Sequence, residues 1–223
     1  MNNTVFVSDT VHKLNVSVYY PDNYDELPLV VYLHGAGERG KTVEHIIRHG
    51  IPKLISEGFE IPAVVVCPQC PEKYIWNNIV EEVKDIILNV AEKYKIKKDK
   101  ILITGSSMGG YGTWELSMCF PEMFAAAAPV SGGGATFRAC KLNKIPIKAY
   151  HGTEDYVVEF INTEMMVNAV NRNNGNAELI PLNGMQHNDA IDYAYRSTDL
   201  IDWLLKQRKN DFSRIPEPYE SCF

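Results

Sequence analysis

The chain has 223 residues, of which 45% are hydrophobic and 22% are charged, and its formal net charge is −6. This length and composition indicate one globular domain with a substantial core. The acidic balance argues against nucleic-acid and anionic-membrane partners, and no apolar run is long enough to cross a bilayer.

The N-terminal segment lacks the basic start and the continuous apolar stretch of a signal peptide. It instead contains an alternating pattern in which Leu14, Val16, Val18 and Tyr20 share one face. This period of two predicts a half-buried antiparallel strand at a sheet edge. Short, nearly continuous apolar runs follow, as expected for strands that are covered on both faces: residues 29–33, 63–67, 101–104, 125–130, 145–150 and 178–182.

Apolar residues at helical spacing lie between these runs. They predict helices over residues 43–56, 79–94, 111–120, 160–173 and 189–208. The last helix is expected to bury Tyr193, Leu200, Trp203 and Leu204. Strands that alternate with helices predict an α/β fold, a doubly wound and mostly parallel sheet with helices on both faces. We expect a single domain over residues 1–210 and an irregular tail over residues 211–223.

The most informative stretch is Gly105-Ser106-Ser107-Met108-Gly109, directly after the strand-like residues 101–104. It fits G-x-S-x-G, the nucleophile elbow, in which a serine occupies a tight turn between a strand and a helix. The strained turn leaves no room for side chains two residues before and two after the serine. Ser107 has glycines at both positions, whereas Ser106 does not. Ser107 is the candidate nucleophile, and a Gly/Ser-rich turn without catalytic role is the alternative.

A serine nucleophile needs a base, and the base needs a group that orients it. In α/β-hydrolases these groups follow in the order Ser, Asp or Glu, His. His187 is the only histidine after His151, and it lies just past the last predicted strand. Asp155 is the only aspartate between Ser107 and His187, and Glu154 is the runner-up for the acid. We expect His187 to take the Ser107 proton while Asp155 orients the imidazole.

The oxyanion of an acyl-transfer reaction needs preorganised donors. One is expected to be the backbone N–H of Met108, and the other that of Ala36 in the glycine-rich loop His34-Gly35-Ala36-Gly37-Glu38-Arg39-Gly40. The chain has none of the glycine-rich patterns of nucleotide-binding sites. His34 and His151 open two loops, and both are expected to be structural, hydrogen-bonded histidines.

The five cysteines cannot all pair within the chain, which argues against a disulfide framework and favours a reducing cytoplasm. Cys67-Pro-Gln-Cys70 has the spacing of a redox motif or half of a zinc site. A second C-x-x-C that would complete a metal site is missing. We therefore expect a loop after a strand here, with no metal and no cofactor.

These residues together resemble the α/β-hydrolase superfamily. More narrowly, they resemble the small serine carboxylesterases related to feruloyl esterases, polyhydroxybutyrate depolymerases and predicted prolyl-oligopeptidase-like peptidases. The segments that carry the resemblance are residues 33–40, 67–70, 105–112, 125–133 and 151–155. The resemblance implies Ser107, Asp155 and His187 as the catalytic triad and the main-chain amides of Ala36 and Met108 as the oxyanion hole.

Many such relatives carry a lid between the sixth and seventh core strands, where this chain offers only residues 131–144. The comparison implies an open site without a large lid domain, which favours accessible esters over buried long-chain lipids. Trp76 and Tyr111 are candidates for contact with an aryl acyl group, with core packing as the alternative. Glu38 and Arg39 are candidates for lining the acyl or alcohol pocket, with a surface ion pair as the alternative.

The sequence thus predicts a serine carboxylesterase that hydrolyses short-chain acyl or hydroxycinnamoyl esters through an acyl-enzyme on Ser107. Its expected partner is a small-molecule ester. A serine peptidase of the prolyl-oligopeptidase-like type and a noncatalytic binding protein are the alternatives, and acyl transfer to an acceptor other than water would use the same triad. A homodimer stays open, because an edge strand or the C-terminal tail could mediate it.

Overall fold

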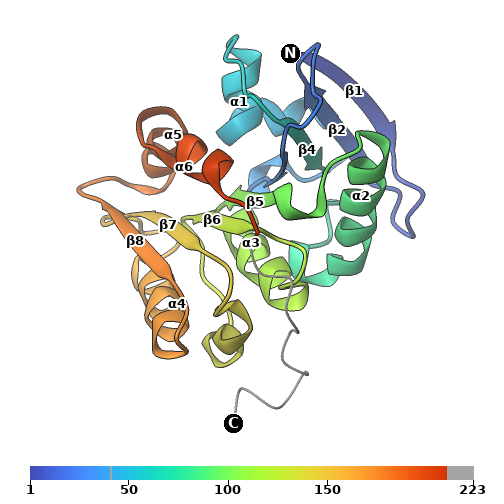
Figure 1. Ribbon diagram of the computed structural model, residues 1–223. Helices are drawn as coiled ribbons and strands as arrows, with labels where there is room; N and C mark the ends of the chain where they lie inside the picture. The colour runs from blue at the N-terminus through green and yellow to red at the C-terminus, as the bar shows by residue number, and fades with distance from the viewer. Residues whose placement is uncertain (41, 210–223) are drawn as a thin grey trace.

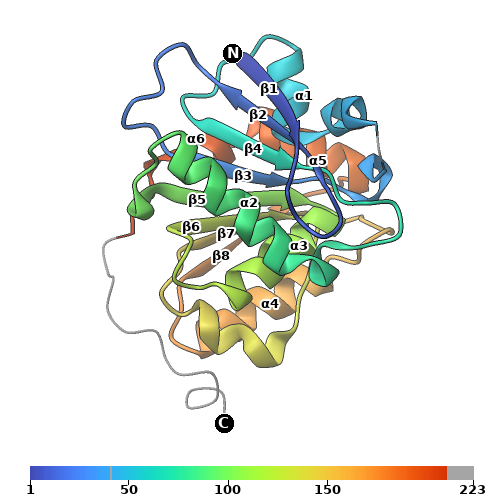
Figure 2. The same ribbon diagram turned by 90° about the vertical axis from the view of Figure 1, so that its right-hand side faces the viewer.

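The computed structural model describes residues 1–40 and 42–209, which form a sheet with helices on both sides (Figures 1 and 2). Within these residues the sheet has eight strands in the order β1-β2-β4-β3-β5-β6-β7-β8. Strands β3 to β8 are parallel to one another, whereas β2 is antiparallel to both β1 and β4. The predicted α/β class is therefore confirmed. The strands are β1 (Asn2–Val7), β2 (Asn15–Tyr20), β3 (Leu29–Leu33), β4 (Val64–Pro68), β5 (Ile101–Ser106), β6 (Ala126–Val130), β7 (Ile147–Gly152) and β8 (Ala177–Leu182).

The alternating N-terminal segment forms β2, which is antiparallel as predicted, but the prediction that it lies at the sheet edge was wrong. The edge strand is β1. Because β1 is largely exposed, its residues show no clear hydrophobic period, and pairing with β2 decides its conformation. With a strand on each side, β2 buries Ser17 and Tyr19 as well as Val16 and Val18.

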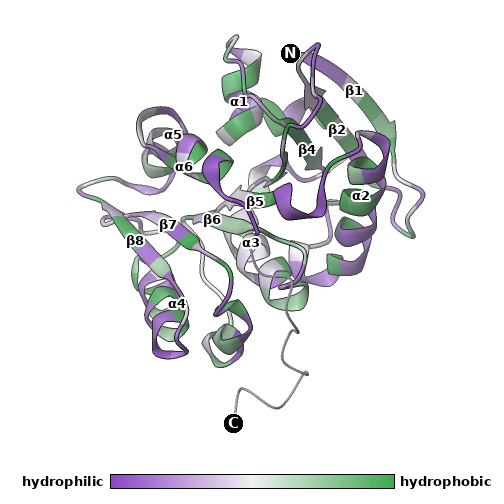
Figure 3. Cartoon of the chain, viewed as in Figure 1, coloured by the Kyte–Doolittle hydropathy of each residue, from purple (hydrophilic) through white to green (hydrophobic). Residues whose placement is uncertain are grey.

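The two faces of the sheet carry separate apolar cores. One face is covered by α2 (Val80–Lys93), α3 (Met108–Cys119) and α4 (Ile161–Arg172), which stand in front of the sheet in Figure 2. The other is covered by α1 (Gly50–Ser56), α5 (His187–Ser197) and α6 (Leu200–Lys206). Figure 3 shows β2 and β4 in green, whereas α2 and α4 alternate between green and purple because only one side of each helix faces the core.

The helix predicted over residues 43–56 is interrupted. It consists of a 3₁₀ helix, η2 (Val43–Arg48), and α1 (Gly50–Ser56). Pro52 has no N–H to donate to the Arg48 carbonyl, so a continuous α-helix cannot pass through this point. Gly50 provides the turn with a φ of +64°.

The helix predicted over residues 189–208 is also interrupted, between α5 and α6. Thr198 is extended, and its hydroxyl donates to the Ala194 carbonyl and accepts from Leu200 N–H, which ends one helix and begins the next. Leu200 and Leu204 are buried as predicted. Tyr193 was wrongly assigned to the buried side, since it is 42% exposed, and Trp203 is only half-buried.

The connection between β6 and β7 is short and contains a 3₁₀ helix, η5 (Thr136–Leu142), in agreement with the expected lack of a large lid domain. Cys140 in this helix is disulfide-bonded, whereas Cys67, Cys70 and Cys119 are free. The predicted tail, residues 211–223, lies outside the described residues. No helix in the described part of the chain is long and apolar enough to span a membrane.

Cys67 lies within β4 rather than in a loop, and Cys70 follows that strand. The two cysteines belong to different cores, one on each face of the sheet. Burial raises the pKa of the Cys70 thiol to about 12 and also raises that of Cys67. Because the thiolate is the reactive form, this arrangement does not favour redox chemistry. Within residues 1–40 and 42–209 no group of three or more His, Cys, Asp or Glu side chains could hold a metal ion.

Candidate active site

Ser107 lies on the sharp turn between β5 and α3. Its φ of +57° and ψ of −118° are strained for a residue with a side chain. A Cβ at Gly109 would lie 1.8 Å from the Leu33 carbonyl oxygen, and a Cβ at Gly105 would lie 2.5 Å from the Gly109 carbonyl oxygen. Helix α3 can therefore approach β3 and β5 this closely only with glycines at these two positions, which is the steric condition that the elbow pattern predicted.

The two adjacent serines have different surroundings. Ser106 is buried, and its hydroxyl lies 3.1 Å from the Tyr32 hydroxyl. The Ser107 hydroxyl is partly accessible and lies 2.9 Å from Nε2 of His187, to which it can donate its proton. The structure thus brings Ser107, and not Ser106, to the predicted base.

His187 begins α5, five residues after the end of β8, and meets Asp155 from the loop after β7. Its Nδ1–H donates to Asp155 Oδ2 over 2.6 Å, so its Nε2 is left as the acceptor for Ser107. The side chain of Asp155 is fully buried and that of His187 is 11% exposed. The three predicted side chains therefore form one chain of hydrogen bonds with the polarity that general-base activation of a serine requires.

Asp155 is held by its own loop. Its Oδ1 accepts hydrogen bonds from the backbone N–H groups of Val157 and Val158, both 2.9 Å long, which leaves Oδ2 for His187. This self-capping turn is a common use of aspartate. Glu154, the runner-up for the acid, is exposed, and the geometry does not bring it into this chain of hydrogen bonds.

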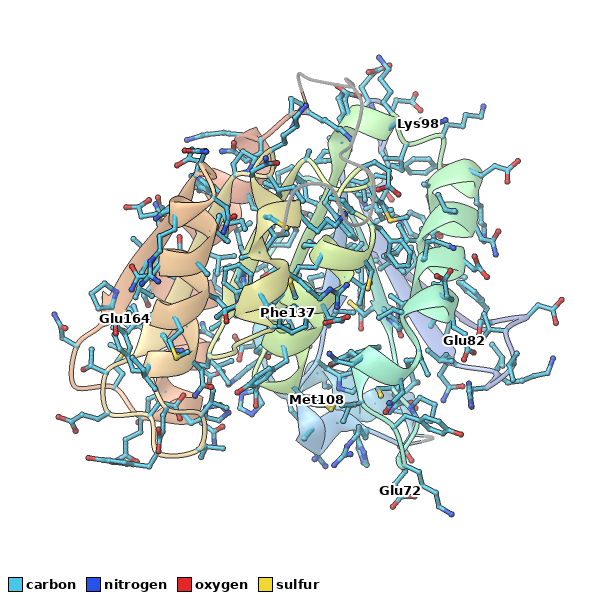
Figure 4. The ribbon with its side chains drawn as sticks, turned by 90° about the horizontal axis from the view of Figure 1, so that it is seen from below. Glu72, Glu82, Lys98, Met108, Phe137 and Glu164 are labelled. Carbon is cyan, nitrogen blue, oxygen red and sulfur yellow. The ribbon has the colours of Figure 1, made fainter. Side chains whose placement is uncertain are left out.

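The two predicted oxyanion donors belong to residues that begin helices next to Ser107. Met108 is the first residue of α3 (Figure 4), so its N–H has no partner within the helix. Ala36 begins the 3₁₀ helix η1 (Ala36–Glu38), directly after Gly35, at which an added Cβ would be 3.5 Å from Ser107 Cβ. In the described part of the chain neither N–H donates to a protein acceptor. Both amides are free for an oxyanion, and the assignment stays a prediction.

A buried histidine fixes the loop that carries Ala36. His34 Nδ1–H donates to the Gly35 carbonyl over 2.6 Å, and Nε2 accepts from Cys70 N–H over 3.0 Å. Burial lowers the pKa of His34 to about 4, in keeping with a neutral ring that both donates and accepts. His34 therefore has the structural role that the sequence predicted for it.

Trp76 was a candidate for substrate contact, and the structure corrects this assignment. Its side chain is fully buried, its Nε1–H donates to the His34 carbonyl over 2.9 Å, and its ring packs edge-on against that of His34. Because the indole is fully buried in the core, it cannot contact a ligand. Trp76 instead stabilises the glycine-rich loop through its hydrogen bond to the His34 carbonyl.

Glu38 and Arg39 also belong to this loop. Glu38 is 3% exposed, with its carboxylate 3.8 Å from His34 Nδ1, and burial raises its pKa. Arg39 instead donates from Nε to the Ala36 carbonyl over 3.0 Å. Both side chains contact the segment around Ala36, and a role in lining the acyl or alcohol pocket stays a prediction.

Tyr111 lies one turn after Ser107 in α3, and its N–H donates to the Ser107 carbonyl. Its ring is half-buried, and burial together with the nearby Asp155 carboxylate raises the pKa of its phenol. Of the two aromatic candidates, Tyr111 is the one beside the triad.

One contact of the site was not predicted. His151 was expected to be structural, and it is fully buried and hydrogen-bonded, but its Nε2 also lies 3.2 Å from Asp155 Oδ2. The spacing of four residues between His151 and Asp155 was the available signal. Outside a helix, however, a spacing of four residues does not by itself predict a side-chain contact. Here the turn after β7 brings the two side chains together.

The sequence profile of the phospholipase/carboxylesterase family matches residues 67–194. A bifunctional acetylxylan esterase/xylanase from Neocallimastix patriciarum is 30% identical over 157 residues, which are 67% of this chain but 22% of that protein. Among solved structures, a thermostable esterase is 28% identical with a TM-score of 0.80 over 92% of this chain and 63% of its own. A mutant of the feruloyl esterase module from Clostridium thermocellum is 17% identical, with a TM-score of 0.71 over 97% and 91% of the two chains, which is a likeness of fold.

Proposed function

The chain belongs to the phospholipase/carboxylesterase family of α/β-hydrolases, and from that premise we propose that it is a serine carboxylesterase acting on short-chain acyl or hydroxycinnamoyl esters. The observation that carries the proposal is the continuous chain of hydrogen bonds from Ser107 through His187 to Asp155. The chain spans 22% of the acetylxylan esterase/xylanase and 63% of the thermostable esterase. The complete activities of these longer proteins are therefore not assigned to this chain.

In the proposed acylation step, Ser107 Oγ attacks the ester carbonyl as His187 Nε2 takes its proton. The tetrahedral intermediate carries its negative charge toward the N–H groups of Ala36 and Met108. Asp155 stabilises the protonated imidazole, which then protonates the leaving alcohol. Ser107 is left as an acyl ester.

Water resolves this ester in the second step. His187, neutral again, takes a proton from water as the water oxygen attacks the acyl carbonyl, and returns that proton to Ser107 Oγ. The products are the free acid and the regenerated enzyme. Ser107 and His187 carry every proton that is transferred, while Asp155 and the two amides only stabilise the charges that develop.

The proposed substrate class rests on two supports. The similar proteins include an acetylxylan esterase and a feruloyl esterase module, and the acyl groups of these ester classes are small or aromatic. In this chain, half-buried Tyr111 lies beside Ser107, and Phe137 on η5, which packs against α3, is 74% exposed (Figure 4). These two rings are the candidates for contact with an aryl acyl group.

The nucleophile is tested by Ser107→Ala. We expect hydrolysis of p-nitrophenyl acetate to fall by at least about three orders of magnitude in kcat, because Ser107 supplies the hydroxyl that is hydrogen-bonded to His187 Nε2. Ser106→Ala is the matched control and should retain turnover. A serine-directed phosphonate should add one mass increment to the peptide that contains Ser107. Turnover that survives in Ser107→Ala would refute the proposal.

The substrate class is tested by a panel of acetyl, butyryl, octanoyl and feruloyl esters with a dipeptide amide. We expect the acetyl, butyryl and feruloyl esters to be cleaved with higher kcat/KM than the octanoyl ester and the amide. A preference for the amide would point to a peptidase. Phosphonate resistance together with tight binding of an ester would point to a noncatalytic binding protein.

A further inference from the structure

The Asp155 carboxylate is shared by two histidines. His187 approaches Oδ2 from α5 with Nδ1 at 2.6 Å, and His151 approaches the same oxygen from the end of β7 with Nε2 at 3.2 Å. The His151 side chain is fully buried. Its place in the fold is therefore fixed by packing, and its hydrogen-bonding groups must find partners inside the protein.

The partners of His151 determine where its protons lie. Nε2 faces the Asp155 carboxylate and also the Val158 carbonyl, 2.8 Å away. Both of these groups only accept, so Nε2 must carry a hydrogen. Nδ1 lies 2.6 Å from the hydroxyl oxygen of Thr163 on α4, whose single hydrogen is donated to the Gly132 carbonyl. The contacts of Nε2 thus require a hydrogen on that nitrogen, whereas burial lowers the pKa of His151 and disfavours the doubly protonated ring.

The network continues to the nucleophile helix. Thr163 Oγ1 also contacts the Gly132 carbonyl, just after β6. A Cβ at Gly132 would lie 2.6 Å from Gly110 C and from Tyr111 N, so the backbone there packs directly on the first turn of α3. His151 therefore connects the loop that carries Asp155 to the backbone at Gly132, which packs on the first turn of α3 beside Ser107.

We propose that His151 is a positioning residue for the Asp155–His187 pair: its Nε2–H is shared between the Val158 carbonyl and the Asp155 oxygen that also accepts from His187. This inference rests on the proposed function. The donated hydrogen fixes the direction of Oδ2 toward His187 and withdraws part of its negative charge. His151 does not touch the reacting atoms, so it acts only through Asp155.

The titratable groups around His151 set the sign of the expected effect. Asp155 faces it from its own loop, His187 lies beyond Asp155 on α5, and the Tyr111 phenol lies near Asp155 on α3. From α4 it meets the Thr163 hydroxyl and the Phe160 ring, neither of which titrates. Loss of the Nε2–H leaves more negative charge on Asp155, which stabilises the protonated, inactive form of His187. The acid limb of the kcat/KM profile should then move to higher pH.

Two variants distinguish the contribution of Nε2 from that of Nδ1. His151→Gln can keep a donor near the position of Nε2, whereas His151→Asn is too short to reach Asp155 but keeps a polar group near Thr163. We expect His151→Asn to lower kcat about tenfold or more with little change in KM, and to shift the acid limb upward by about 0.5 pH unit. His151→Gln should stay within about threefold of the wild type with an unshifted limb.

The control is His12→Asn, which removes an imidazole from the connection between β1 and β2, where it pairs with Glu82 of α2. It should leave both kcat and the acid limb unchanged. Phosphonate labelling counts the competent sites in each variant, so lost protein is not mistaken for lost rate. Equal behaviour of His151→Asn and His151→Gln would overturn the proposal.

A second readout does not depend on activity or on the folding of a variant. In ¹⁵N-histidine-labelled wild type, the His151 resonances should show a proton on Nε2 at neutral pH. A proton on Nδ1 alone would overturn the proposal even if the esterase activity is as proposed. If the wild type instead fails to hydrolyse any ester while a proton is observed on Nε2, the proposed function fails and the assignment of the Nε2 hydrogen stands.

Discussion

At the scale of single residues, the site depends on groups that are held away from their ordinary states. Ser107 has a positive φ, and His34 is a neutral, buried histidine whose pKa is lowered to about 4. Both conditions are imposed by neighbouring residues. Glycines allow the sharp turn at Ser107, and His34 donates to the Gly35 carbonyl and accepts from Cys70 N–H. A strained backbone or a buried neutral histidine persists only when the surrounding structure compensates for its energetic cost.

His34 should make the protein less stable in mild acid. Its folded pKa lies below its unfolded value, so its contribution is complete above about pH 6.5 and is lost as the pH falls toward 4. The loss is roughly 3 kcal/mol at most. The physical reason is that a proton on Nε2 would face the Cys70 N–H, which now donates to it.

The measurement is the free energy of unfolding in urea between pH 7 and pH 4.5, compared with His34→Gln. That variant can keep an acceptor for Cys70 N–H without titrating, so its profile should be flatter. His45→Gln on η2 is the control and should keep the wild-type slope. Glu38, whose pKa is raised by burial, contributes with the opposite sign and makes both profiles flatter. Parallel profiles for wild type and His34→Gln would contradict this account.

At the scale of elements, the break between η2 and α1 shows how packing selects a conformation that helical spacing does not reveal. Gly50 has a φ of +64°, and a Cβ there would lie 2.3 Å from the ring of Tyr32, a fully buried residue of β3. The Tyr32 hydroxyl in turn meets Ser106 beside the nucleophile. The start of α1 is therefore fitted closely to the strand next to the elbow.

Gly50→Ala should destabilise the protein by about 2–5 kcal/mol, because a left-handed alanine and a collision with a buried ring both have to be accommodated. Gly58→Ala is the matched control. Gly58 has a φ of +93° with no atom within 4 Å of an added Cβ, so it isolates the backbone effect. We expect its cost to be about 1–2 kcal/mol by urea unfolding. Equal losses in the two variants would show that Tyr32 adapts without cost.

At the scale of the whole molecule, two apolar cores on opposite faces of one sheet hold the site at the carboxyl ends of β5 and β7 and in the segment after β8. Open parallel sheets place their sites at this edge. The antiparallel strands β1 and β2 lie at the other end of the strand order from β7 and β8. Their contribution is expected to be to stability rather than to chemistry.

Deletion of residues 2–7 should test this. Without β1, strand β2 becomes an edge that still carries buried Val16 and Val18, and unpaired apolar edges associate. We expect Tm to fall by about 5 °C or more and oligomers to form with rising concentration. Scanning calorimetry and light scattering measure the two effects. An unchanged Tm in a monodisperse protein would show that β1 is dispensable.

The sequence by itself determined the parallel strands, the elbow and the order of Ser107, Asp155 and His187, because these depend on local rules. Apolar runs mark buried strands, a strained turn requires glycines at fixed positions, and few aspartates and histidines follow the serine. It did not determine the helix breaks at Gly50 and Thr198, since their causes include a ring on β3 and a hydrogen bond that ends a helix early.

Only the tertiary structure decided which loop residues meet. It assigned Trp76 to the core behind His34, moved the sheet edge from β2 to β1, and brought His151 to the same carboxylate oxygen as His187. These contacts join segments that are far apart in the chain or are folded together by one turn. Neither periodicity nor spacing predicts these contacts, because they depend on how the strands and the loops that follow them are arranged in space.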